Sequence, residues 1–128
     1  MPSAKIALGM FDGCLKTLGL IREGKKRRDE KIDQALFALY AALNETKSYV
    51  ENRQRGKRRN QRREFRIAHL WDAASVPLRN IDKVLASRCF AKGNYWMDPQ
   101  VWTEDRIKAN GITWEDMFRR TRDILLHS

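Results

Sequence analysis

Apolar residues recur every three or four positions along most of this chain, which is the spacing that places them on one face of an α-helix. The clearest run predicts a long helix from about Asp29 to Asn52, and it consists of Ile32, Leu36, Leu39, Leu43, Thr46 and Val50. Its alternation of four and three residues is typical of a bundle seam, so we expect this helix to lie at the centre of the core. No segment alternates with a period of two for long enough to form a strand. The sequence therefore predicts an all-α fold, a helical bundle of about four main helices and one short helix.

Two glycines predict the ends of the first two helices. A helix over residues 3–23 is expected to end at Gly24, and Gly56 falls just beyond the long helix, where a C-terminal glycine cap belongs. The chain should therefore turn within residues 55–58. A third helix is expected over residues 60–74.

Pro77 predicts the next break in the helical pattern. Proline lacks a backbone donor and disfavours the α conformation at the preceding residue, Val76, so the chain should restart there with Ser75 as the cap. The fourth helix is expected to stop before Gly93. Residues 93–102 are rich in large aromatic side chains, which indicates a loop that covers one end of the bundle.

The C-terminal part of the chain holds two further start signals. Asp98 precedes Pro99, which favours a short helix over residues 99–109. Thr113 followed by Asp116 resembles a capping box and predicts a last helix over residues 114–126.

Length and composition limit the number of domains, the state of the cysteines and the presence of membrane segments. A length of 128 residues with 42% hydrophobic residues suits a single domain, residues 1–128, with one packed core. Cys14 and Cys89 lie in apolar helical surroundings without the spacing of metal ligands, so we expect buried, reduced thiols and a cytoplasmic location. No apolar run approaches the ~18 to 20 residues that span a bilayer, so no transmembrane segment is expected.

The positive charge of the chain is concentrated in two segments. Residues 53–66 hold seven arginines and one lysine against a single acid, Glu64, and residues 22–31 hold six basic residues against three acids. Together these segments account for the whole formal net charge of +10. A field concentrated in this way is typical of proteins that bind a polymer of phosphates.

We therefore expect the protein to bind nucleic acid, and RNA in preference to DNA, because no helix-turn-helix or zinc-finger spacing is present. Arginine predominates over lysine, which favours bidentate recognition of phosphate. With about six contacts, affinity should fall roughly a thousandfold between 50 and 200 mM salt. The expected contacts are Arg55, Lys57, Arg58, Arg59, Arg62, Arg63 and Arg66, with a second patch of Lys25, Lys26, Arg27 and Arg28.

Other interpretations of the charge stay open at this stage. The basic segments could form a solvated face, dock on an acidic protein, or lie against an anionic membrane surface. The two patches are separated by the long helix, so they could contact different parts of one ligand or different subunits of a homo-oligomer.

A short pattern near the C-terminus points to a reaction. Arg122 is followed by Asp123, three apolar residues and His127, which resembles the Arg-x4-6-His motif of HEPN-domain ribonucleases. The resemblance implies a small all-α bundle that cleaves RNA without a metal, with His127 as the catalytic histidine and Arg122 stabilising the phosphate. His69 with Arg62 or Arg63 is an alternative placement. The chain has no Glu-x-x-His pair, Gly-rich phosphate loop or paired nucleophile, so no metal or other cofactor is expected.

Overall fold

The computed structural model describes residues 30–127, apart from the side chains at positions 114, 118 and 124–127. Its elements are α2 (Glu30–Gln54), α3 (Gln61–Leu78), α4 (Lys83–Met97), the 3₁₀ turn η1 (Pro99–Val101), α5 (Glu104–Ala109) and α6 (Trp114–His127). No strand occurs within this range, so the predicted all-α class is confirmed. The helix predicted over residues 3–23, Cys14 and the patch from Lys25 to Arg28 lie outside the described residues.

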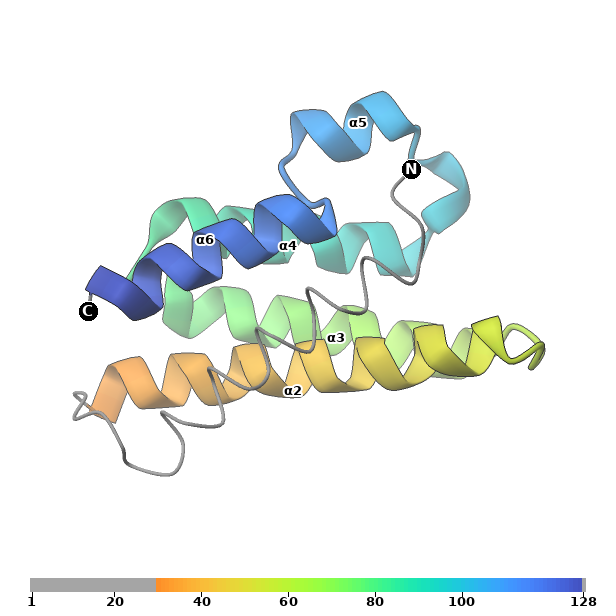
Figure 1. Cartoon of the computed structure of the whole chain (residues 1–128), viewed down its shortest axis with the longest axis horizontal. Helices are drawn as coiled ribbons and strands as arrows, with labels where there is room; N and C mark the ends of the chain where they lie inside the picture. The colour runs from red at the N-terminus through yellow and green to blue at the C-terminus, as the bar shows by residue number, and fades with distance from the viewer. Residues whose placement is uncertain (1–29, 128) are drawn as a thin grey trace.

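The helices form a layered bundle in which α3 is the middle element (Figure 1). It runs antiparallel to α2 on one side and packs against α4 on the other, while α6 lies over α4. The predicted seam of α2 is confirmed in its centre, because Leu36, Leu39, Leu43 and Thr46 are buried. Among the described helices, however, α3 is the one with a long helix on each side, because α2 packs mainly on α3, which also packs along α4.

Pro77 does not end the third helix, contrary to the sequence prediction. Helix α3 continues through Pro77 to Leu78, and Ser75 lies inside it, where its hydroxyl donates to the carbonyl of Asp72 at 2.6 Å. The proline falls in the last turn, and the carbonyl that its missing N–H would have bonded belongs to Ala73, an exposed residue open to water. The cap of α4 is Asp82, whose Oδ1 accepts from the N–H of Leu85 at 2.8 Å.

Gly93 does not end α4 either, and the predicted aromatic loop is in part the last turns of that helix. A Cβ at position 93 would lie 2.1 Å from the Asp72 carboxylate and 3.1 Å from the carbonyl oxygen of Ala68. The glycine therefore permits close approach of α4 to α3 and does not stop the helix. The extra turn carries Tyr95 and Trp96 against the bundle.

The C-terminal elements occur in the predicted order, but one predicted helix is present as two shorter elements. The helix predicted over residues 99–109 is split into η1 and α5, and Thr103 caps α5 by accepting from the N–H of Arg106 at 3.1 Å. The predicted start of the last helix is confirmed, since the hydroxyl of Thr113 accepts from the N–H of Asp116 at 3.1 Å. None of the helices within residues 30–127 is both long and apolar enough to cross a membrane.

Candidate nucleic-acid interface

The basic segment of residues 53–66, here called the basic corner, joins the antiparallel helices α2 and α3. Gly56 has a φ of +86°, a left-handed conformation that glycine adopts without steric cost. The N–H of Gly56 donates to the carbonyl of Arg53 and that of Lys57 to the carbonyl of Asn52, both at 3.1 Å. The predicted glycine cap is thus confirmed, and it places the cations at one tip of the bundle.

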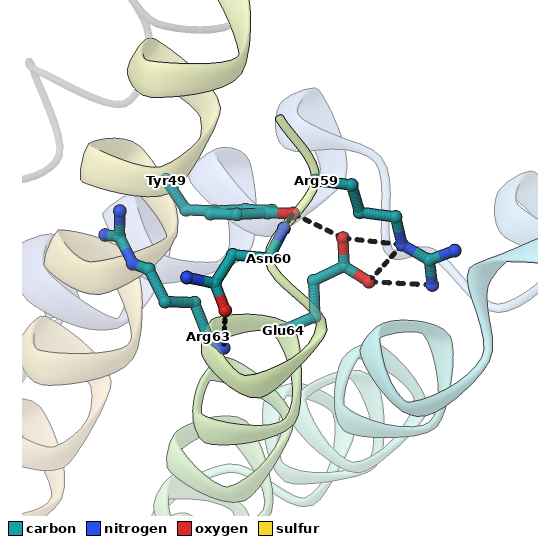
Figure 2. Close-up of polar contacts among 5 residues, drawn as sticks. All are labelled: Tyr49, Arg59, Asn60, Arg63 and Glu64. Carbon is teal, nitrogen blue, oxygen red and sulfur yellow. Dashed lines mark hydrogen bonds and ion pairs between the residues drawn. The ribbon is translucent and has the colours of Figure 1, made fainter. Parts of the chain in front are cut away.

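Glu64, the acid of the basic corner, is buried and fully engaged (Figure 2). The Nε of Arg59 donates to its two carboxylate oxygens at 2.9 and 3.1 Å, and the hydroxyl of Tyr49 donates to it from α2. The same hydroxyl accepts from the backbone N–H of Asn60 at 3.0 Å. Tyr49 and Glu64 therefore tie the end of α2, the connection and the start of α3 into one network.

Tyr49 is held in its neutral form by its surroundings. Burial raises the pKa of Tyr49 above its ordinary value, and the hydrogen bond to the Glu64 carboxylate raises it further. The hydroxyl consequently stays a donor at neutral pH. Its ring packs edge-on against Trp96 with centroids 5.8 Å apart, and the guanidinium of Arg63 lies 5.3 Å from the ring centroid.

Arg63 is likewise bound within the fold. Its Nη2 lies 3.1 Å from the Glu45 carboxylate and 3.2 Å from the hydroxyl of Ser48, both on α2. Arg59 and Arg63, two of the expected nucleic-acid contacts, thus pair with carboxylates inside this structure. This structural role, like the roles of Tyr49 and Glu45, is not evident from the sequence, because these partners are 15 and 18 residues from Glu64 and Arg63 in the chain.

The remaining expected contacts of the basic corner differ from these two. They are exposed. Arg59 is exposed as well, but it pairs with Glu64, whereas none of the other five forms an ion pair with an acid among residues 30–127: Arg55, Lys57, Arg58, Arg62 and Arg66. Arg53 is also exposed, and its guanidinium donates to the carbonyl of Lys57 at 3.0 Å, which stiffens the turn. The structure therefore separates cations that pair with carboxylates of the corner from cations that pair with no acid among residues 30–127.

The predicted catalytic pair lies on α6, at the far end of the chain. Arg122 is exposed, with its Nη2 3.7 Å from the Asp123 carboxylate, and the side chain of His127 lies outside the described residues. Five residues of a helix span about 140° of rotation, so positions 122 and 127 are on different sides of α6. His69 is exposed on α3, two turns from Arg62. The catalytic roles stay predictions.

No group of three or more His, Cys, Asp or Glu side chains is placed to hold a metal ion in the part of the chain that the structure describes. Comparison of the chain with protein-family models, with curated proteins and with solved structures finds no significant match.

Proposed function

We propose that this protein binds nucleic acid, RNA in preference to DNA, through the basic corner between α2 and α3. The observation that carries the proposal is a cluster of exposed cations in the basic corner that pair with no acid among residues 30–127. They are the expected contacts Arg55, Lys57, Arg58, Arg62 and Arg66, with Arg53 beside them. An ordinary surface interleaves cations with acids. Here the one acid of the segment, Glu64, is buried and already neutralised by Arg59.

The position of these cations at the start of α3 strengthens the argument. The N-terminus of a helix carries a partial positive charge, so arginines there cost several tenths of a kcal/mol each unless an anion is present. Glu64 is the acid of the first turn of α3, and it faces inward. A phosphate group would offset both the repulsion among the side chains and the unfavourable field of the helix.

The shape of the corner supports RNA over duplex DNA. A protein that reads the major groove presents its basic residues along one exposed helix. These cations instead lie in the short connection before α3 and on its first two turns, at the tip of the bundle. A compact tip of this kind suits the backbone of a single strand or of an RNA loop.

The expected salt dependence of binding follows from counterion release. Five phosphate contacts give a slope of log affinity against log salt of about −3.5 for a single strand and about −4.5 for a B-form duplex. We expect binding in the micromolar range or tighter at low salt, with a slope in this range for a single-stranded RNA.

The decisive experiment compares two variants with the same net charge. Each removes four exposed cations by substitution with Gln: Arg55, Lys57, Arg58 and Arg62 in the corner variant, and Arg79, Lys83, Lys108 and Arg119 in the control. In the corner variant the slope of log affinity against log salt should be about 3 units shallower than in the wild type. The control variant should keep most of the wild-type slope. Equal losses in both would show that binding depends on net charge alone, and would contradict a site at the corner.

An acidic protein is the competing partner for the same cations. A pull-down from cell lysate with and without nuclease separates the two cases, because partners held through nucleic acid are released by the nuclease. Retention of one acidic protein after nuclease treatment, with no affinity for purified RNA or DNA, would replace the proposed function.

A further inference from the structure

An open hollow of about 500 Å³ adjoins the basic corner. This volume is within the roughly 300–1,000 Å³ of typical ligand pockets. It is bounded by the last turns of α2, the start of α3 and the junction between α4 and η1. The lining residues that matter here are Tyr49, Tyr95, Trp96 and Pro99 on the apolar side, and Arg53 and Arg59 on the cationic side.

The aromatic residues of the hollow form a connected set. Tyr95 packs edge-on against Trp96 with ring centroids 5.3 Å apart, and Trp96 does the same with Tyr49 at 5.8 Å. Trp102 continues the set behind Tyr95, at 6.3 Å. Trp96 and Tyr49 are buried, so Tyr95, which is half-buried, is the aromatic side chain of the lining that is open to a ligand.

The charges of the hollow favour a flat, uncharged ligand. The charged groups of the wall are bonded within the fold, because Glu64 pairs with Arg59 and the guanidinium of Arg53 donates to the carbonyl of Lys57. A planar ring can instead lie against aromatic side chains and beneath a guanidinium, as stacked bases do in proteins that bind single strands. The exposed side-chain amides of Gln54 and Gln100 add one donor group and one acceptor each, which matches the mixed edge of a base.

We propose that this hollow receives one unpaired base of a single-stranded nucleic acid whose phosphates lie on the adjoining cations of the basic corner. The inference rests on the proposed function and adds the class of ligand to it. Bases of a duplex are paired and stacked, so they cannot enter the hollow without being flipped out. The protein should therefore prefer single strands to duplexes of equal charge.

The first test changes the ligand and leaves the protein intact. Binding of the wild-type chain is measured for an oligothymidylate of about 12 nucleotides, within the roughly 4–16 nucleotides of single-strand sites, and for an abasic strand with the same number of phosphates. We expect the abasic strand to bind about 5- to 150-fold more weakly, the range for loss of a stacked base. The salt slopes of the two strands should agree, because their phosphate contacts are the same.

The second test changes the hollow and uses a matched control. Tyr95→Leu removes the aromatic face but keeps an apolar side chain, and Phe90→Leu makes the same kind of change on an exposed residue of α4 outside the hollow. Tyr95→Leu should weaken binding of the oligothymidylate and leave binding of the abasic strand unchanged. Phe90→Leu should alter neither.

The outcomes separate this inference from the proposed function. Equal affinity of the wild type for the intact and abasic strands overturns the base site and leaves a corner that binds phosphates only. Failure to bind either strand, and also a single-stranded RNA of the same length, at low salt overturns the proposed function together with it. The ligand comparison uses the wild-type chain, so it decides the matter even where Tyr95→Leu lowers stability.

Discussion

The hydroxyl group of Tyr49 should stabilise the basic corner, and Tyr49→Phe tests this with the change of a single atom. The hydroxyl donates to the buried Glu64 carboxylate and accepts from the N–H of Asn60 at 3.0 Å (Figure 2). Phenylalanine keeps the ring, and with it the edge-on contact with Trp96. The substitution therefore removes two hydrogen bonds between the end of α2 and the start of α3 without leaving a large cavity.

The expected loss can be worked out bond by bond. A hydrogen bond to a charged group contributes about 1.5–3 kcal/mol, and Glu64 is too buried for water to replace it freely. The second bond contributes less, because Asn60 is exposed and its N–H can bond water. The ion pair with Arg59 remains and holds the carboxylate in place. We expect Tyr49→Phe to lower the free energy of unfolding by about 2 kcal/mol.

Urea denaturation followed by circular dichroism measures this loss. The matched control is Tyr95→Phe, since the hydroxyl of Tyr95 makes no hydrogen bond within residues 30–127, and the control should change stability by less than about 0.5 kcal/mol. Binding of RNA by Tyr49→Phe should weaken a few-fold with an unchanged salt slope, because no cation is lost. A stability change in Tyr49→Phe as small as that of the control would refute the network as a determinant of the corner.

Three further predictions follow from other parts of the fold. Leu39 is completely buried in α2, so Leu39→Ala should destabilise the protein by about 2–5 kcal/mol in chemical denaturation, and a loss below about 1 kcal/mol would contradict its place in the core. Burial lowers the pKa of Lys92 from 10.5 to about 8, so between these pH values the unfolded chain holds a proton that the native state has released. The wild type should therefore gain stability relative to Lys92→Met as pH rises through this window, by up to about 3 kcal/mol, and a difference that stays constant with pH would disprove it. Purified protein should show no EDTA-resistant cleavage of single-stranded RNA above a mock purification, because catalysis needs positioned groups and positions 122 and 127 face different sides of α6. Cleavage that His127→Ala abolishes would establish the ribonuclease alternative. Cleavage that is lost only in His69→Ala would place the site on α3.

The sequence by itself determined the features that depend on neighbouring residues. The seam from Leu36 to Thr46 needs only the helical period, so it predicted both the helix and its buried face. The turn at Gly56 and the cap at Thr113 likewise depend on backbone conformations and hydrogen bonds within a few residues. The concentration of positive charge on one segment is also a property of the sequence alone.

Tertiary structure decided what depends on residues distant in the chain. Gly93 signals a helix end by propensity, but it lies inside α4 where α3 approaches so closely that a Cβ would collide with the Asp72 carboxylate. The helix continues past it and carries Tyr95 to the hollow. The same holds for the cations: Arg59 and Arg62 are indistinguishable in the sequence and both are exposed, yet Arg59 is bound to a buried carboxylate and Arg62 pairs with no acid among residues 30–127. Which side chains are buried and which form ion pairs depends on which helices pack together, and a local sequence pattern does not determine that packing. The folded bundle therefore separates the arginines that pair with carboxylates in the basic corner from those that pair with no acid among residues 30–127.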